Sequence, residues 1–359
     1  MPLTGYLTEP DIRGALRYIT NHYAQLTDLI NLPETSFEGR SVLGIKISFR
    51  DPRNPFKPGL LFIGGVHARE LVPPDLLLSF AVKLCQAFMR GGSLKLGGKT
   101  YSFMEVQRVV HGLDLFVLPM VNPDGRVFVQ TPPPTGDAWW RKNRRPNACS
   151  VECIGVDINR NYDFLFLSGI GTSTDSCSDV FKGCAPFSES ETRNVLYLLD
   201  NHPNIVRFVD IHSPYQMILC PWGDDDNQTT DPSMNFMNPQ YDGLRGERGD
   251  TLYKEYIPAA DREQFAVIGA RVSAAIATMR GTPYPSGPSA ELIGFLTANG
   301  LQYTYSRHFV DPQKRKVLGM SLELGGGFQP DYQEALNIIS EVSAGLMEFC
   351  LEAASVRIE

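Results

Sequence analysis

The sequence predicts an α/β fold, in which helices pack against a sheet of mostly buried strands. Its 359 residues, 43% of them hydrophobic and 20% charged, are enough for a well-buried core. Short apolar runs alternate with helical patterns along the whole chain, and this alternation is typical of α/β layers. Because no internal repeat or long linker divides the chain, we expect a single domain over residues 1–359.

Six short runs are mostly apolar and rich in β-branched residues, as strands covered on both faces should be. They span residues 41–48, 59–65, 113–121, 205–212, 216–220 and 317–324. Patterns typical of helices lie between them, at residues 10–30, about 75–90, 189–201, 262–280 and 331–352. The segment "SESETRNVLYLL" starts with serine and acidic residues, which favour the first turn of a capped helix.

Two long stretches, 131–188 and 221–261, are irregular and rich in turn-forming residues such as Pro, Asn, Asp, Ser and Gly. Irregular segments of this size are uncommon in a compact domain and are often functional. We therefore expect a scaffold whose long loops surround a site.

Composition argues against several classes of function. The formal net charge of −7 disfavours nucleic acid as the main partner. The longest apolar runs are shorter than the roughly 20 residues that a membrane span needs, so we expect no membrane partner. The first residues lack the basic, apolar and small-residue segments of a signal peptide. The chain is thus expected either to stay inside the cell or to begin after processing.

Two of the six histidines, His67 and His212, stand at the carboxyl ends of predicted strands. Ligands bind at this edge of open α/β sheets. With Glu70, these histidines would form a His₂Glu set whose fourth position is open, which is the arrangement of a catalytic zinc. The HExxH motif of helical zinc proteases is absent. Taken alone, "HARE" at 67–70 could also be a surface turn followed by a helix.

Five further motifs follow in order, and they decide between these interpretations. They are "NPDG" at 122–125, "WRKNR" at 140–144, "GVDINRNY" at 155–162, "IHSPYQ" at 211–216 and "LEL" at 322–324. With these motifs the chain resembles the zinc metallocarboxypeptidases of the carboxypeptidase A/B family over roughly residues 10–350. The resemblance implies a mixed, largely parallel sheet of about eight strands with helices on both faces. It also implies one zinc ion per chain and peptide or protein C-termini as substrates, and we expect a monomer.

The resemblance carries specific roles to the residues of the metal centre. His67, Glu70 and His212 would hold Zn²⁺, which polarises the scissile carbonyl and acidifies its bound water. Asp157 resembles the carboxylate that accepts a hydrogen bond from the first zinc histidine. Glu323 resembles the general base that takes the proton of the water and passes it to the leaving amine.

Four polar residues resemble groups that contact the substrate. Arg141 matches the arginine that stabilises the tetrahedral oxyanion. Asn159 and Arg160 resemble the pair that clamps the terminal carboxylate of the substrate, for which the planar fork of arginine is well suited. Arg69 resembles a further arginine along the substrate path.

One position departs from the family pattern. A mobile tyrosine is expected over the substrate, and the alignment of "FLTANGLQYTY" at 295–305 puts Phe295 in its place. Tyr284, in "TPYPSGPSAEL", is a rival for this position. Tyr303 or Tyr305 could supply the missing hydroxyl instead.

The same alignment places Leu301 at the bottom of the specificity pocket, which implies apolar or aromatic C-terminal side chains. Leu219 and Gly223 resemble further pocket walls. Against this, the acidic run at 224–226 could attract C-terminal Lys or Arg, bind Ca²⁺ or simply solvate a loop.

Cys153 and Cys177 match a disulfide of secreted family members, and Cys149 and Cys184 could form a second bridge. Two bridges in one loop would indicate an oxidising compartment, hence a secreted or periplasmic protein. Two other functions stay open: a related zinc amidase acting on cell-wall or other modified peptides, and a non-catalytic binding protein on the same scaffold.

Overall fold

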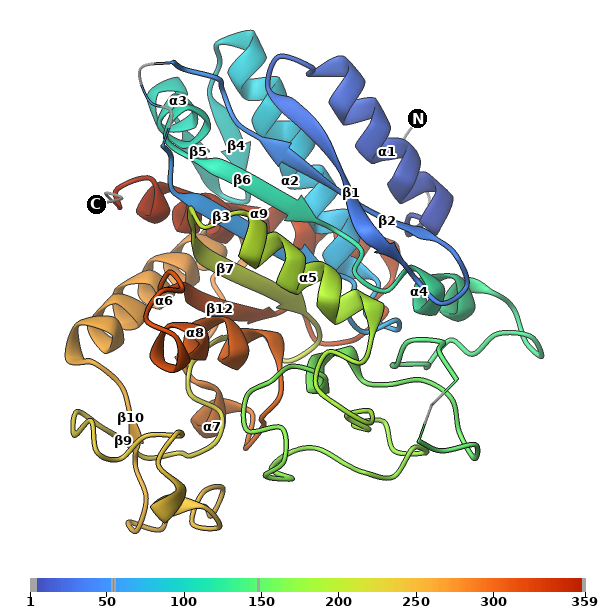
Figure 1. Cartoon of the computed structure of the whole chain (residues 1–359). Coiled ribbons are helices and arrows are strands. Elements are labelled where there is room, and N and C mark those ends of the chain that lie inside the picture. The colour runs from blue at the N-terminus through green and yellow to red at the C-terminus, as the bar shows by residue number, and fades with distance from the viewer. Residues whose placement is uncertain (1–4, 53, 55, 147–148, 357–359) are drawn as a thin grey trace.

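Eight strands form one central sheet, with helices on both of its faces (Figure 1). The structure is a computed structural model that describes residues 5–52, 54, 56–146 and 149–356. Across the sheet, the strands follow in the order β1 (Thr27–Thr35), β2 (Ser41–Ile47), β6 (Asp114–Leu118), β3 (Gly59–Gly64), β7 (Ile205–His212), β12 (Leu318–Glu323), β8 (Met217–Cys220) and β11 (Ser286–Pro288).

The centre of the sheet is parallel, and an antiparallel pairing follows it on each side, while the edge strand β11 is parallel to β8. Strands β6, β3, β7 and β12 run in one direction, while β2 joins β6, and β8 joins β12, in the opposite sense. The predicted mixed, largely parallel sheet is therefore confirmed. Because parallel strands end at the same edge, the segments that follow β3, β7 and β12 meet there.

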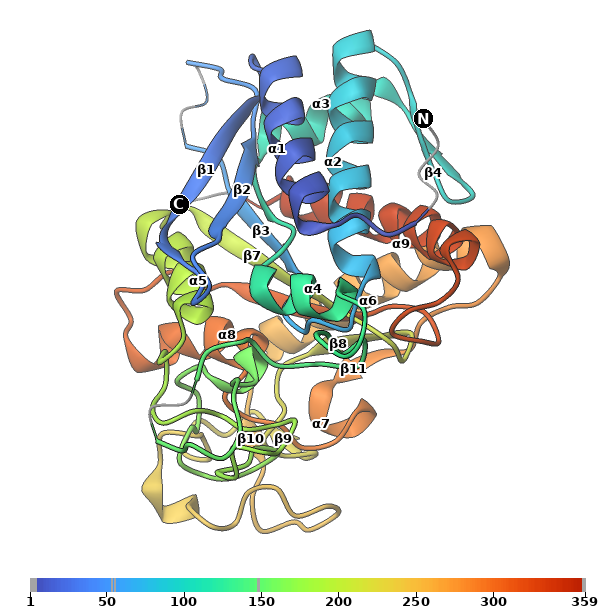
Figure 2. The same ribbon diagram turned by 90° about the vertical axis from the view of Figure 1, so that its right-hand side faces the viewer.

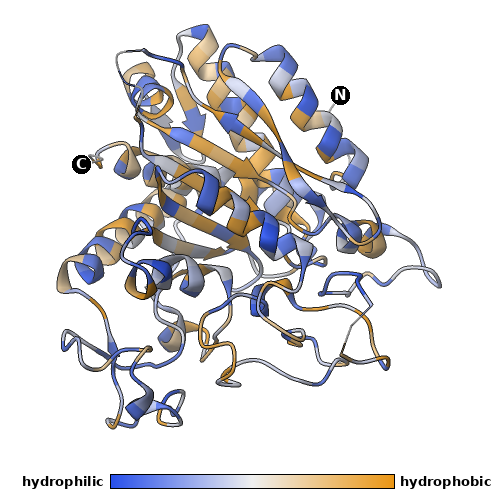
Figure 3. Ribbon diagram, viewed as in Figure 1, coloured by the Kyte–Doolittle hydropathy of each residue, from blue (hydrophilic) through white to orange (hydrophobic). Residues whose placement is uncertain are grey.

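Helices cover the two faces in separate layers (Figure 2). One layer contains α1 (Glu9–His22), α2 (Val72–Arg90), α3 (Phe103–Gly112), α6 (Ala259–Arg280) and α9 (Tyr332–Ala353), and the other contains α5 (Ser190–Asn201) and α8 (Gly300–Val310). Strand β3 shows why both layers are needed. Leu60 and Phe62 pack into the first layer and Leu61 and Ile63 into the second, because successive side chains of a strand point to opposite faces. Figure 3 shows the resulting contrast between apolar central strands and the hydrophilic outer side of α5.

The six predicted strands all exist, but the predicted helix over residues 10–30 is too long. Helix α1 ends at His22, and Thr27–Thr35 forms the edge strand β1. This strand pairs on one side only, and its burial alternates along much of its length. A half-polar edge strand that contains a proline lacks the apolar run by which buried strands are found.

The remaining elements are short. They are α4 (Pro123–Gln130), α7 (Ser289–Leu292), the hairpin of β4 (Leu94–Leu96) and β5 (Lys99–Tyr101), the pair β9 (Gln228–Thr229) and β10 (Glu255–Tyr256), and 3₁₀ turns at Ile158–Arg160 and Pro239–Tyr241. The two stretches predicted to be irregular contain little else. In Figures 1 and 2 both gather below the sheet, on the side of β12.

Within the described part of the chain, α2 is the one helix whose length and composition would allow it to cross a membrane. Its most apolar window is 67% buried inside the protein, where it packs against α1, α3 and α9. The apolar character of α2 is thus explained by its place in the core.

Two disulfides brace the loop of residues 131–188. Cys149 pairs with Cys184 and Cys153 with Cys177, across 35 and 24 residues of sequence, which confirms both predicted bridges. Cys85, Cys220 and Cys350 are free and buried.

We predict that these bridges supply a large part of the stability of the protein. Each bridge restricts the unfolded chain and thereby raises the free energy of unfolding by about 3–4 kcal/mol. Reduction should lower the melting temperature of the wild-type protein in a thermal scan. A variant with all four bridged cysteines replaced by serine should melt at the lower temperature with or without reductant. A wild-type melting temperature that does not respond to reductant would contradict the prediction.

Candidate metal centre

The site is built where β3, β7 and β12 end. His212 is the last residue of β7, and Glu323, the last of β12, stands directly beside it in the register of the two parallel strands. The segment with His67 and Glu70 follows β3 through Gly65, whose φ of +62° is in the left-handed region. A Cβ at Gly65 would lie 3.2 Å from backbone atoms of Pro119 and Met120, so glycine permits this tight turn.

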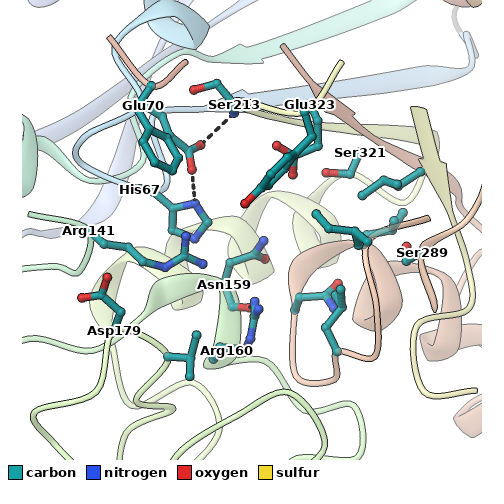
Figure 4. A pocket seen from close by; sticks show the side chains of 18 of the residues that line it. His67, Glu70, Arg141, Asn159, Arg160, Asp179, Ser213, Ser289, Ser321 and Glu323 are labelled. Carbon is teal, nitrogen blue, oxygen red and sulfur yellow. Dashed lines mark hydrogen bonds and ion pairs between the residues drawn. The ribbon is translucent and has the colours of Figure 1, made fainter. Parts of the chain in front are cut away.

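His67, Glu70 and His212 converge through three atoms that could bind a metal. The Nδ1 atoms of the two histidines are 3.1 Å apart, and each lies 2.7–3.0 Å from a carboxylate oxygen of Glu70. All three side chains are buried, and Figure 4 shows His67 and Glu70 facing each other at one end of the cavity. Ligands held about 2.0–2.1 Å from a tetrahedral zinc are themselves about 3.3 Å apart, so this set fits the ion closely.

A buried aspartate stands behind each histidine. Asp157 Oδ1 lies 3.2 Å from His67 Nε2, and Asp210 Oδ1 lies 2.9 Å from His212 Nε2. With the protons on Nε2, both Nδ1 atoms are free to bind a cation, and each carboxylate fixes the tautomer and the ring orientation. Asn159 Nδ2 is 3.2 Å from the same His212 nitrogen. The contact of this nitrogen with Asp210 is shorter and is an ion pair rather than a hydrogen bond, and we assign the Nε2 proton to it because its oxygen carries charge.

The family motifs point to Asp157, whereas Asp210 was not predicted from the sequence. The signal was present: Asp210 and His212 are two residues apart on β7, so both side chains point to the same face of the strand. An aspartate in an otherwise apolar strand run requires a partner, since a buried unpaired carboxylate is costly.

The electrostatics of the centre favour a cation. Burial lowers the pKa of His212, but Asp210 and Glu70 outweigh it and hold that pKa well above its ordinary value. Burial raises the pKa of Glu70, yet His67 and His212 bring it well below the ordinary range, so its carboxylate is ionised. A field of buried carboxylates that stabilises positive charge on an imidazole equally favours a divalent ion in the same place.

Glu323 is buried beside the metal centre, and its Oε2 has no hydrogen-bond partner among the described residues. Burial is the main cause that raises its pKa to about 8, and Glu70 and Asp210 add to the rise against the opposing charges of His212 and Arg141. An unpaired carboxylate of this kind, held in a cavity, is a candidate for proton transfer.

Three polar groups on the disulfide-braced loop face the same cavity (Figure 4). Arg141 donates from Nε and Nη2 to Asp157 Oδ2 at 3.0 and 2.9 Å. Arg160 donates to the carbonyl oxygens of Gly171 and Asn159, both at 2.7 Å, and Asn159 Oδ1 accepts from the amide of Gly300 at 3.0 Å. These bonds fix the orientation of all three side chains.

The cavity has a volume of about 290 Å³, and part of its lining is apolar. The apolar part includes Leu219, Ile293, Phe295, Leu296 and Leu301. A concave site that combines apolar side chains with convergent polar groups can bind a small ligand in one orientation.

Residues 12–341 match the family model described as zinc carboxypeptidase. The chain belongs to the zinc carboxypeptidase family. It is 35% identical over 228 residues to a carboxypeptidase B of Helicoverpa zea, a match that covers 63% of this chain and 48% of the relative. It is 26% identical over 296 residues to carboxypeptidase A4 of Mus musculus, covering 80% of this chain and 58% of the relative. The chain thus spans about half the length of the curated relatives it matches.

Solved structures have the same fold as this member of the zinc carboxypeptidase family. Thrombin-activatable fibrinolysis inhibitor superposes with a TM-score of 0.77 at 20% identity, covering 98% of this chain and 75% of the other. Carboxypeptidase A of Helicoverpa armigera superposes with a TM-score of 0.74 at 22% identity, covering 98% and 74%. At these identities the likeness shows the fold alone.

The zinc carboxypeptidase fold brings the predicted substrate-contacting residues around one cavity. Arg141, Asn159, Arg160, Phe295 and Leu301 line it, as does Arg69. The guanidinium of Arg69 stacks on the Phe328 ring at 4.6 Å and pairs with Asp179 at 3.0 Å.

Two other predicted features lie away from the cavity. Gly223 is not among its lining residues, and neither is any residue of the acidic run at 224–226. Asp224 and Asp225 are buried instead, and burial raises the pKa of Asp225 to about 6.

We predict that Asp210→Asn weakens zinc binding by about 10- to 100-fold, the usual cost of losing a carboxylate behind a metal-binding histidine. The measurement is the zinc dissociation constant of the variant, obtained by competition with a coloured chelator. Asp28→Asn, at an exposed carboxylate of β1, serves as the matched control and should bind zinc as the wild type does. Equal zinc affinity for Asp210→Asn and wild type would show that Asp210 does not support the metal.

Proposed function

We propose that the chain is a zinc-dependent exopeptidase that hydrolyses the C-terminal peptide bond of peptides and proteins. The observation that carries this proposal is the placement of Glu323. Its buried, unpartnered carboxylate stands in register with His212, in the cavity that also contains the guanidinium groups of Arg141 and Arg160. An acid–base group, a metal centre and a carboxylate-binding group therefore surround one space.

His67, Glu70 and His212 hold the zinc ion in this proposal. When bound, zinc supplies a Lewis acid for the scissile carbonyl and lowers the pKa of its water. Glu323 would accept the proton of the attacking water on its unpartnered oxygen and deliver it to the nitrogen of the leaving amino acid. Its burial supports this role, because a carboxylate without solvent is a stronger base than one in water.

Arg141 stabilises the negative oxygen that develops on the scissile carbonyl. Its side chain is tied to Asp157 through Nε and Nη2, so it does not have to reorganise when that charge appears. The same aspartate also contacts His67, which couples the position of the arginine to that of the metal centre.

Arg160 and Asn159 bind the terminal carboxylate of the substrate, which restricts cleavage to the last peptide bond. Two carbonyl oxygens hold the Arg160 fork in place within the cavity, and such a fork binds a carboxylate bidentately. The presence of both residues favours an exopeptidase over a zinc amidase acting on modified peptides.

The apolar part of the cavity lining supports a preference for apolar or aromatic C-terminal residues. Leu301 is 3% exposed and stands at the cavity wall with Leu219 and Leu296. The acidic run at 224–226, which would favour basic residues, lies outside the lining. The two disulfides support a secreted or periplasmic location, where such bridges persist.

We predict that the zinc-loaded protein releases Phe or Leu from N-blocked dipeptides, and releases Lys, Arg or Glu more slowly. A zinc chelator should abolish release, and Glu323→Gln should lower kcat by about 100- to 10,000-fold, the range for a lost acid–base group. Glu263→Gln, an exposed carboxylate of α6, is the control and should leave kcat unchanged. If the zinc-loaded protein released none of these residues, the exopeptidase proposal would be wrong, and an amidase or binding protein would replace it.

We predict that Leu301→Asp shifts the preference towards C-terminal Lys and Arg, because it places a carboxylate in the wall that contacts the substrate side chain. The ratio of kcat/KM for Phe over Lys substrates should fall about 5- to 30-fold, roughly the effect of an ion pair worth 1–2 kcal/mol. Leu301→Val, which keeps the wall apolar, should preserve the ratio. Thermal scans should show that both variants are folded, and an unchanged ratio in Leu301→Asp would remove Leu301 from the specificity pocket.

A further inference from the structure

The irregular stretch 221–261 contains a buried group of carboxylates that the proposed function does not use. Asp224 and Asp225, from the acidic run at 224–226, are 0% exposed. Neither oxygen of Asp224 has a hydrogen-bond partner among the described residues, and Asp225 Oδ2 has none either. Aspartate is almost never fully buried unless it is paired, because an ionised carboxylate without a partner is costly away from water. These side chains therefore require a partner of opposite charge.

A second part of the same stretch brings another carboxylate to this group. Strands β9 and β10 pair in parallel, so the segments that precede them lie at the same end of the pair (Figure 1). Asp250 precedes β10 as Asp225 precedes β9, and Asn227 Nδ2 donates to the carbonyl of Asp250 at 2.7 Å. Asp250 Oδ2 is buried and has no partner among the described residues. With it, the group contains four buried carboxylate oxygens that accept no hydrogen bond.

The charged groups that act on Asp225 are themselves carboxylates. Burial is the main cause that raises the pKa of Asp225 to about 6, and Asp224, Asp226 and Asp250 add to the rise. The amide of Asn227 opposes it with a hydrogen bond to Asp225 Oδ1 at 2.9 Å. The group thus holds an excess of negative charge that a bound cation would stabilise.

Two side chains act on Asp224, and neither satisfies both of its oxygens. Burial raises the pKa of Asp224, and the charge of Arg245 opposes this rise, but the guanidinium donates to Asp242 at 2.6 Å and to two backbone carbonyls instead. The other side chain, Glu255, is a carboxyl whose pKa is raised well above its ordinary value by burial and by Asp224. A protonated Glu255 can satisfy one oxygen of Asp224, which leaves the other three oxygens of the group without a partner.

Calcium is the cation that suits this group. Ca²⁺ takes about six to eight oxygen ligands in flexible geometry, from carboxylates, backbone carbonyls and water. Among the described residues, only His67, Glu70 and His212 bring three metal-binding atoms within 4.8 Å of one another. The carboxylates of the stretch 221–261 are therefore more widely spaced than the ligands of a compact tetrahedral ion. A larger ion whose remaining ligands are carbonyls or water fits that spacing, and a set of oxygen ligands alone disfavours zinc.

We propose that the carboxylates of Asp224, Asp225 and Asp250 bind one Ca²⁺ ion, which stabilises the stretch 221–261. This inference goes beyond the proposed function and does not depend on it. The site adjoins the cavity, because the carbonyl of the preceding residue, Gly223, accepts from the amide of Leu296 at 2.7 Å, and Leu296 lines the cavity. Calcium therefore also steadies that part of the cavity wall.

The test is a calorimetric titration of the zinc-loaded protein with calcium chloride, since bound zinc keeps calcium out of the other centre. The wild type should bind one Ca²⁺ per chain with a Kd below about 1 mM, the range of extracellular calcium modules. Asp225→Asn and Asp250→Asn should each raise Kd at least about tenfold, because each removes one ionised ligand. Glu247→Gln, at an exposed carboxylate of the same stretch, is the matched control and should bind calcium as the wild type does.

The melting temperature separates lost binding from lost folding. Calcium at about ten times its Kd should raise the melting temperature of the wild type by roughly 2 °C, and magnesium at the same concentration by less, since it demands a near-ideal octahedral site. Without calcium, Asp225→Asn should melt at or above the wild-type temperature, because it removes an unpaired buried charge. The proposal would be overturned by a wild type that binds no calcium, by equal shifts with magnesium, or by an Asp225→Asn protein that keeps the wild-type affinity or melts lower without calcium.

Discussion

The candidate site depends on one buried carboxylate, that of Asp157. One of its oxygens lies 3.2 Å from His67 and accepts the amide of Asn159 at 2.9 Å, while the other accepts two bonds from Arg141. Burial raises the pKa of Asp157, but Arg141 and His67 reverse this and hold it well below the ordinary range. His67, Arg141 and the start of the turn that carries Asn159 and Arg160 are thus positioned by a single anion.

This arrangement explains why long irregular loops can carry a well-defined site. Arg141, Asp157 and Arg160 all lie on the stretch 131–188, which has little regular structure. This stretch is held by side-chain contacts rather than by backbone hydrogen bonds of helices or strands. The two disulfides cross-link it, and Asp157 contacts His67 in the segment after β3. A loop fixed in this way can hold charged side chains in the orientation that rapid chemistry requires.

The sequence allowed the centre of the fold and much of the site to be predicted for identifiable physical reasons. Buried parallel strands appear as apolar runs, and residues at their carboxyl ends, such as His67 and His212, must meet at one edge. The family motifs then located Arg141 and Arg160, which line the same cavity, and Asp157, which accepts hydrogen bonds from Arg141. The edge strand β1 was not accessible in this way, because it has no apolar run. Asp210 was missed although the sequence contained its signal, which is its two-residue spacing from His212 on one strand.

The charges at the buried end of the cavity favour a bound dication over an empty site. Four buried carboxylates, those of Glu70, Asp157, Asp210 and Glu323, face two guanidinium groups, those of Arg141 and Arg160. If all are ionised, two negative charges remain, and a divalent cation neutralises them. Burial raises the pKa of Glu323 to about 8, so without a cation this carboxyl is largely protonated at neutral pH. A nearby dication favours the ionised form. In the proposed function, the metal that would activate the substrate would therefore also make Glu323 available as a base, so that one electrostatic balance links metal binding and proton transfer.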